Sequence, residues 1–108
     1  MDIFFKILGS SSSGNSAILS IGELTVLIDA GLSCKRIQTL LKKEGIEIEK
    51  IDAVFLTHEH NDHSVGIKGL SKYANLPIYA NRDTINAVQP KLSRRPNWKV
   101  FELSLIHI

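Results

Sequence analysis

Four side chains that can bind metal ions fall within six consecutive residues of this chain, His58-Glu59-His60-Asn61-Asp62-His63. They directly follow the apolar run Ala53-Val54-Phe55-Leu56, which predicts a strand buried on both faces. Neutral imidazole and carboxylate are good ligands for zinc, and also for manganese or iron. Open sheets with flanking helices place their sites at the carboxyl ends of strands. The pattern predicts a metal site here, and an incidental polar surface loop is the less favoured alternative.

The spacing of these residues indicates how metal ions would be shared. In an extended turn, residues two positions apart project to the same side, so His58 and His60 are expected to hold one ion. Asp62 and His63 lie next to them and are expected to serve a second ion. Two adjacent ions polarise a phosphoryl or carbonyl oxygen and lower the pKa of a bridging water. The residues therefore favour hydrolytic chemistry at a di-metal site.

Apolar periodicity and turn-forming residues predict an α+β domain, in which helices pack on one face of a mixed sheet. Residues 9–16 are turn formers and predict a loop. Ser33 is the predicted cap of a helix that ends at Gly45. Further helices are expected at residues 64–74 and 82–88. Strands are expected at residues 4–8, 17–20, 24–28, 51–57, 78–80 and 98–103.

Composition limits the classes of partner. The hydrophobic fraction is 44% and the charged fraction 22%, both ordinary for a globular protein. The net charge of +2 is too weak to argue for nucleic acid by itself. Basic residues are more frequent towards the C-terminus. A solvated surface is the favoured interpretation of this cluster, and a phosphate-binding rim is the alternative. The basic residues are Lys91, Arg94, Arg95 and Lys99.

The single cysteine and the apolar runs bear on location. Cys34 excludes a disulfide within the chain and a cysteine-based zinc site, and it fits a reducing compartment. No apolar run approaches the length of a membrane span. We therefore expect a cytoplasmic protein without a membrane partner.

The segment Phe55-Leu56-Thr57-His58-Glu59-His60-Asn61-Asp62-His63 resembles the signature loop of the metallo-β-lactamase superfamily. The resemblance implies that His58 and His60 bind a first metal, and that Asp62 and His63 bind a second. It implies two divalent ions, with zinc expected ahead of manganese or iron. It also gives Asp62 a catalytic role, in orienting or deprotonating the attacking water.

Residues 9–16, followed by Leu27-Ile28-Asp29-Ala30-Gly31, are similar to the opening of the YycJ/WalJ-type subfamily. Its members are described as metal-dependent hydrolases with proposed DNA exonuclease activity. The resemblance implies a phosphodiesterase or exonuclease acting on nucleic acid, with DNA favoured. It also implies that Asp29 supports the histidine loop by hydrogen bonds without binding metal directly. A simple strand-end carboxylate is the alternative for Asp29.

The serine-glycine run offers a candidate substrate loop. Backbone N–H groups and hydroxyls of such a run can bind a phosphate. A flexible, solvated loop is the equally weighted alternative. The candidate phosphate-binding residues are Ser12, Ser13, Gly14 and Asn15.

Members of the superfamily are longer and fold as four-layer αββα sandwiches. We therefore expect residues 1–102 to form the N-terminal half of such a domain, with the remaining metal ligands outside this chain. Residues 103–108 match no expected segment and are interpreted as a non-native tail. The isolated chain is expected to be inactive or to bind metal weakly. Two alternatives remain, a glyoxalase- or lactonase-like hydrolase of thioesters or lactones, and a non-catalytic metal-binding module.

Overall fold

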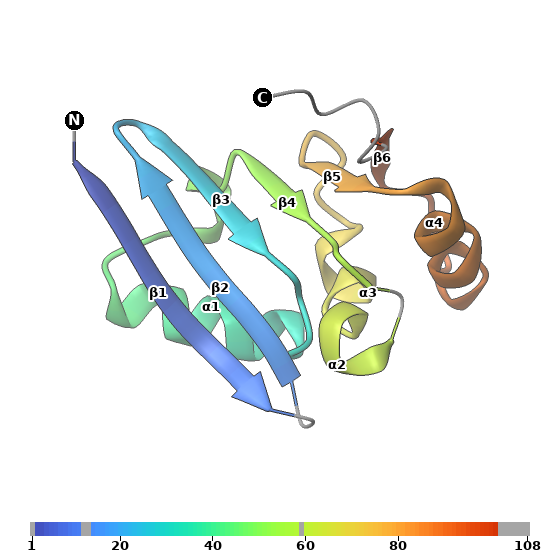
Figure 1. Ribbon diagram of the computed structural model, residues 1–108, viewed down its shortest axis with the longest axis horizontal. Helices are drawn as coiled ribbons and strands as arrows, with labels where there is room; N and C mark the ends of the chain where they lie inside the picture. Colours follow the sequence, from blue (N-terminus) through green and yellow to red (C-terminus); the bar gives the residue numbers. More distant parts are fainter. Residues whose placement is uncertain (1, 12–13, 59, 102–108) are drawn as a thin grey trace.

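A computed structural model describes residues 2–11, 14–58 and 60–101, apart from the side chains of Ser11, Asn61 and Asp62. One mixed sheet forms the centre of the fold, and its strands follow chain order across it (Figure 1). The first three strands are antiparallel, and each later strand runs parallel to its neighbour. The strands are β1 (Ile3–Ser11), β2 (Gly14–Ile21), β3 (Leu24–Ile28), β4 (Ala53–Phe55), β5 (Pro77–Ala80) and β6 (Asn97–Val100).

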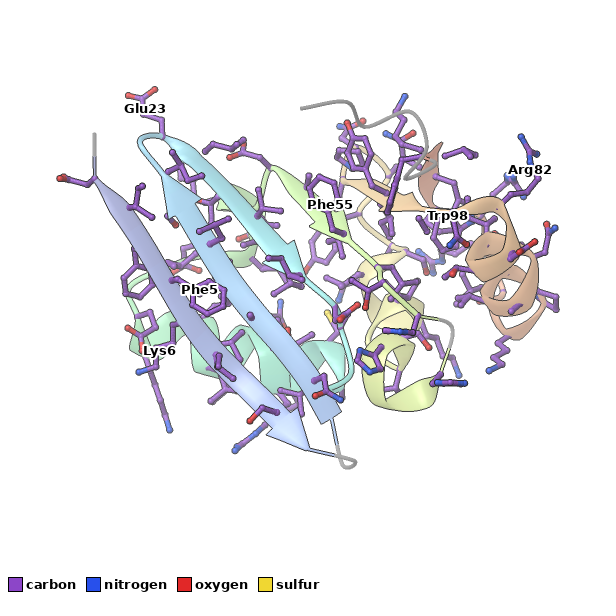
Figure 2. All side chains as sticks on the ribbon, viewed as in Figure 1. Phe5, Lys6, Glu23, Phe55, Arg82 and Trp98 are labelled. Atoms are coloured by element: carbon purple, nitrogen blue, oxygen red, sulfur yellow. The ribbon has the colours of Figure 1, made fainter. Side chains whose placement is uncertain are left out.

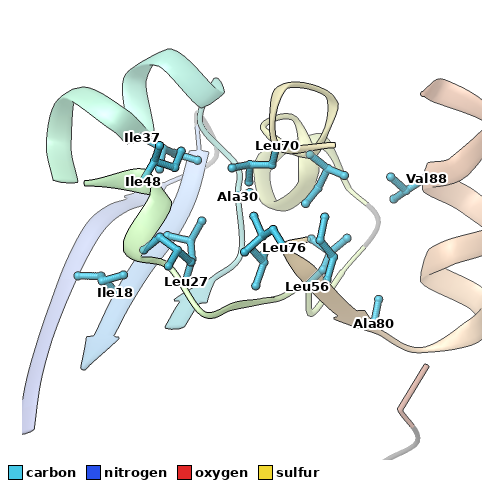
Figure 3. Packing of buried hydrophobic residues seen from close by; sticks show 14 of the residues in the cluster. Ile18, Leu27, Ala30, Ile37, Ile48, Leu56, Leu70, Leu76, Ala80 and Val88 are labelled. Carbon is cyan, nitrogen blue, oxygen red and sulfur yellow. The ribbon is translucent and has the colours of Figure 1, made fainter. Parts of the chain in front are cut away.

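The helices cover one face of this sheet, as the sequence predicts. Figure 3 shows Ile37, Leu70 and Val88 of the helices packed over Leu27 and Leu56 of the strand layer. These side chains belong to one continuous hydrophobic core. The helices are α1 (Cys34–Lys43), α2 (Asn61–Ser64), α3 (Ile67–Leu70) and α4 (Arg82–Val88), with short 3-10 turns η1 (Ile48–Lys50) and η2 (Gln89–Lys91).

Helix α1 begins and ends where the sequence predicts. The Ser33 hydroxyl accepts a hydrogen bond from the backbone N–H of Arg36 at 3.2 Å, which caps the first turn. Ile37 and Leu41 are fully buried against the sheet. Gly45 then adopts a left-handed conformation with φ of 73°, which glycine accepts without steric cost. Both predicted helix signals are confirmed.

The loop predicted at residues 9–16 is wrong at both ends, because these residues extend two strands. Strand β1 continues to Ser11 and β2 begins at Gly14, with Ser10 opposite Asn15 in the ladder. Backbone pairing with the apolar parts of both strands overrides the turn preference of these residues. Gly14 has a φ of 154°, a conformation that side chains rarely permit. Ser12 and Ser13 lie outside the described residues.

Three other predicted elements differ from the structure. The helix predicted at residues 64–74 is shortened to α3, and α2 ends at Ser64, because the Gly66 N–H donates to the carbonyl of Ala30 at 2.6 Å and not to a helical carbonyl. The predicted strand at residues 51–57 is shortened to β4. That strand is not buried on both faces, since Phe55 is 36% exposed. The last strand begins at Asn97 and ends at Val100.

The second face of the sheet is apolar and open to solvent. Phe5, opposite Leu19, and Phe55, opposite Ile28, lie on the side away from the helices (Figure 2). Phe5 is 55% exposed. A shallow hollow of about 350 Å³ on this face is lined by Leu19, Ile21, Leu24, Val26, Ile28 and Phe55. Contiguous apolar patches of this kind mark surfaces that pack against another element or chain. We call these six residues with Phe5 the open apolar face.

No helix among the described residues is long and apolar enough to cross a membrane.

Gly66 is required by a close approach between two segments. Its φ of −74° is ordinary, so any residue could adopt the conformation. A methyl group on its Cα would collide with the carbonyl oxygen of Leu32 and lie 3.0 Å from that of Ala30. We predict that Gly66→Ala lowers the free energy of unfolding by about 2 kcal/mol, as overpacking does. Urea denaturation measures the loss.

Gly22→Ala is the control for this substitution. Nothing lies within 4 Å of the added methyl, and the cost of about 1 kcal/mol comes from the positive φ alone. A Gly66→Ala protein as stable as the wild type would contradict the packing argument.

Candidate metal centre

The carboxyl ends of β3 and β4 lie side by side because these strands are parallel neighbours. Asp29 follows β3, and its backbone N–H donates to the carbonyl of Phe55 at 2.7 Å. Asp29 has a φ of 61°, in the left-handed region that aspartate tolerates better than most residues. This backbone geometry ends the strand and places the carboxylate beside Thr57. Asp29 is only 7% exposed.

The buried carboxylate of Asp29 accepts several hydrogen bonds from the histidine segment. The backbone N–H of Thr57 donates to Oδ1 at 2.7 Å, and the Thr57 hydroxyl lies 2.7 Å from Oδ2. Nδ1 of His63 lies 2.9 Å from Oδ2. One carboxylate therefore contacts both ends of the segment that runs from Thr57 to His63.

Thr57 extends this network to His58. Its hydroxyl oxygen lies 2.9 Å from Nδ1 of His58. A hydroxyl has one proton, and a carboxylate can only accept, so the Thr57 proton points to Asp29. Towards His58 the hydroxyl must then accept, which assigns a proton to Nδ1 of that ring. His63 likewise donates from Nδ1 to Asp29, so Nε2 is the ring nitrogen of both histidines that is suited to ligate a metal.

Backbone hydrogen bonds fix the histidine segment to the residues after β3. The N–H of Ala30 donates to the carbonyl of His63 at 2.7 Å. The carbonyl of His60 accepts from the His63 N–H at 2.9 Å and from the Ser64 hydroxyl at 2.9 Å. The segment is therefore helical from Asn61 onward. The extended turn expected at His58 and His60 is therefore followed by a helix from Asn61 to Ser64.

This backbone brings three imidazole rings near one another. The ring centroid of His58 lies 4.6 Å from that of His63 and 6.2 Å from that of His60. His58 and His60 are exposed, whereas the His63 side chain is 20% exposed. Within residues 2–11, 14–58 and 60–101, no three His, Cys, Asp or Glu side chains lie close enough together to hold an ion. Glu59 and the Asp62 side chain lie outside the described part.

The donor chemistry of these residues fits a divalent metal. Neutral imidazoles whose Nδ1 atoms are engaged by a carboxylate or hydroxyl are the usual form of histidine ligands. The assignment of His58, His60, Asp62 and His63 as ligands stays a prediction, as does the catalytic role of Asp62.

The candidate phosphate-binding residues lie near this centre where they are described. The carbonyl of Asn15 accepts from the N–H of Gly31 at 2.8 Å, and the Ser16 hydroxyl donates to the carbonyl of Asp29 at 2.8 Å. Gly14 is buried at the start of β2. Their contact with a phosphate stays a prediction.

Sequence reasoning missed the role of Thr57. The available signal was its position, directly between the apolar strand and the first histidine, where a hydroxyl can bond in both directions.

A profile of the Metallo-beta-lactamase superfamily matches residues 11–102, most of the chain, and the chain belongs to that superfamily. It is 35% identical over 105 residues to "Exodeoxyribonuclease YycJ" of Bacillus anthracis. It is 41% identical over 85 residues to "Exodeoxyribonuclease WalJ" of Streptococcus pneumoniae serotype 2. These matches confirm the predicted resemblance to the YycJ/WalJ-type proteins.

The chain is shorter than these relatives. The two matches cover 97% and 79% of this chain, but only 40% and 32% of the Bacillus and Streptococcus proteins. A solved B3 metallo-beta-lactamase with an active-site glutamic acid superimposes with a TM-score of 0.73 at 20% identity, over 91% of this chain and 42% of its own. That likeness confirms the predicted fold class, a mixed sheet with helices that corresponds to part of the superfamily fold.

The Asp29 network predicts the protonation of two rings. In metal-free protein at about pH 8, where imidazoles are mostly neutral, we expect His58 and His63 to carry their proton on Nδ1. Thr57→Val should release His58 to protonate at Nε2, while His63 keeps its Nδ1 proton through Asp29. Nitrogen-15 chemical shifts of the imidazoles report each tautomer.

Thr39→Val is the matched control, because the Thr39 hydroxyl donates to the carbonyl of Lys35 within α1. It should leave both tautomers unchanged. A wild-type His58 that is protonated at Nε2 would contradict the network.

Proposed function

We propose that this chain supplies the metal-binding loop of a di-metal hydrolase that cleaves phosphodiester bonds of nucleic acid, with DNA favoured. The observation that carries the proposal is the Asp29 carboxylate, which holds His63 directly and His58 through Thr57. A buried carboxylate that orients two imidazoles is a common support for metal ligands. The relatives named as exodeoxyribonucleases favour nucleic acid over other substrates of the superfamily.

In this proposal His58 and His60 hold one divalent ion, and Asp62 and His63 hold a second. Zinc is the expected metal, because imidazole and carboxylate ligands suit it, with manganese or iron as alternatives. When bound, the ions would polarise the phosphoryl oxygen and lower the pKa of a coordinated water.

The residues of the chain have separate tasks in the reaction. Asp62 orients the water and takes its proton as the water oxygen attacks phosphorus. The bond between phosphorus and the leaving oxygen then breaks, the leaving oxygen takes up a proton from solvent, and Asp62 releases its proton to solvent. Asp29 and Thr57 touch neither substrate nor water, and they keep the imidazole rings in place while this occurs.

The proposal treats residues 1–102 as the N-terminal half of the catalytic domain. The remainder would contribute further ligands and pack on the open apolar face. The isolated chain would then be inactive or bind metal weakly. Residues 103–108, which we interpret as a non-native tail, lie outside the described residues. A cytoplasmic location belongs to the same proposal, because a single cysteine fits a reducing compartment.

Metal content and hydrolysis together test this function. The product of the complete gene should contain about two metal ions per chain, as two-metal hydrolases do. His60→Ala should lower the metal content and slow hydrolysis of labelled DNA by at least about a hundredfold, because the ions supply both the nucleophile and charge stabilisation. Elemental analysis and gel-resolved cleavage are the measurements.

Asn86→Ala, at an exposed position of α4, is the control and should retain metal and activity. Wild-type protein without metal would contradict the proposal and favour a non-catalytic module. Hydrolysis of a glutathione thioester or a lactone, with no cleavage of DNA or RNA, would contradict the substrate class and favour the glyoxalase- or lactonase-like alternative.

A further inference from the structure

A second polar feature lies among the helices, outside the cluster of histidine rings. A hollow of about 430 Å³ is formed by the start of α1, by α3 and by the residues that follow η2. We call it the basic groove. Its lining residues are Ser33, Cys34, Val65, Lys68, Gly69, Lys72, Ser93 and Arg94.

Three cations line this groove without a matching acid. Lys68 belongs to α3 and Lys72 follows the end of that helix, and both line the groove. Arg94 comes from a segment much later in the chain. Across residues 2–11, 14–58 and 60–101, no acidic side chain lines the groove or forms an ion pair with these three residues. Like charges gathered in this way repel one another unless an anion lies between them.

Packing holds the walls of the groove in position. A side chain at Gly69 would collide with Cβ of Cys34, so the start of α1 packs directly on α3 at this glycine. On the opposite wall, the Gln89 amide donates to the carbonyl of Arg94 at 3.3 Å. The indole N–H of Trp98, labelled in Figure 2, donates in turn to the Gln89 side-chain oxygen at 2.7 Å.

The remaining lining groups suit a phosphate ester. Ser33 and Ser93 add hydroxyl groups to the three cations. Burial raises the pKa of the Cys34 thiol, and the Lys72 ammonium opposes this less strongly, so the thiol adds no negative charge near neutral pH. Val65 is 49% exposed and offers an apolar contact beside the cations. Guanidinium and ammonium groups with hydroxyl donors are the common partners of phosphate oxygens.

A second hollow lies between the groove and the end of the histidine segment. This smaller hollow of about 140 Å³ shares Val65 and Lys68 with the groove, and its lining includes Ser64 and Lys91. Ser64 directly follows His63 and donates its hydroxyl to the carbonyl of His60. A chain molecule lying in the groove would therefore extend towards the candidate metal centre.

We propose that the basic groove binds the sugar-phosphate backbone of a nucleic-acid strand whose end reaches the histidine segment. The identity of the strand rests on the proposed function. The geometry of the groove does not depend on a bound metal.

Binding of a fluorescent single-stranded oligonucleotide tests this proposal in the product of the complete gene. The assay contains a chelator, so hydrolysis and metal contacts are removed from the readout. Lys68→Gln, Lys72→Gln and Arg94→Gln are combined in one variant. We expect its dissociation constant to rise at least about tenfold, and the slope of log K against log salt to fall by about two, because each phosphate contact to a single strand contributes about 0.7.

The control variant combines Lys42→Gln, Lys43→Gln and Lys50→Gln, which removes the same charge from exposed positions in the last turn of α1 and in η1. It should change the dissociation constant by less than about threefold. An equal loss of oligonucleotide affinity in both variants would show an effect of net charge alone and would contradict the groove proposal. Unchanged binding by the groove variant would also overturn it.

Inorganic phosphate and a mononucleotide distinguish a strand from a single phosphate. We expect neither to displace the oligonucleotide at equal phosphate concentration. Displacement at that concentration would indicate a site for a small anion and overturn the strand proposal. Measured without the chelator, the groove variant should keep the metal content of the wild type, because none of its three substitutions replaces a proposed metal ligand. The binding assay therefore tests the groove proposal by itself, and elemental analysis tests the proposed metal centre separately.

Discussion

The candidate metal centre depends on one buried carboxylate that accepts hydrogen bonds from a neighbouring strand end. Asp29 stands after β3 in a left-handed conformation, and its oxygens receive the Thr57 N–H, the Thr57 hydroxyl and Nδ1 of His63. These bonds satisfy a charge that would otherwise be costly to bury. They also fix the orientation of two imidazole rings before any ligand arrives. Preorganisation of this kind gives a site its affinity, because ordering is not required at binding.

One face of the sheet is covered by helices that position this centre, and the other face is open to solvent. The helix-covered face holds the core, and close backbone approaches at Gly66 and Gly69 bring the helix that follows the histidines against α1 and the end of β3. The opposite face exposes aromatic and aliphatic side chains such as Phe5 and Phe55. The chain spans 40% of the Bacillus relative that it matches, so the relative has further sequence that could cover such a face.

Much of the fold follows from local patterns, and its departures have physical causes. The cap at Ser33 and the stop at Gly45 are short-range chemistry and were predictable. The separation of α2 from α3 was not, because it arises from the hydrogen bond between Gly66 and Ala30, which are distant in sequence. The histidine motif predicted the site through its composition. The bridging hydroxyl of Thr57 emerged only when parallel pairing of β3 and β4 placed it beside Asp29.

The most direct test of this account is the zinc affinity of an Asp29→Asn variant, measured by competition with a chromophoric chelator in the product of the complete gene. Asparagine tolerates the same backbone conformation but removes the charge that holds both rings. Asp52→Asn is the control, because Asp52 is an exposed carboxylate that accepts from the backbone of Thr25. We expect zinc to bind roughly 10–100-fold more weakly to Asp29→Asn and normally to the control. Equal affinity in all three proteins would contradict the central role of Asp29.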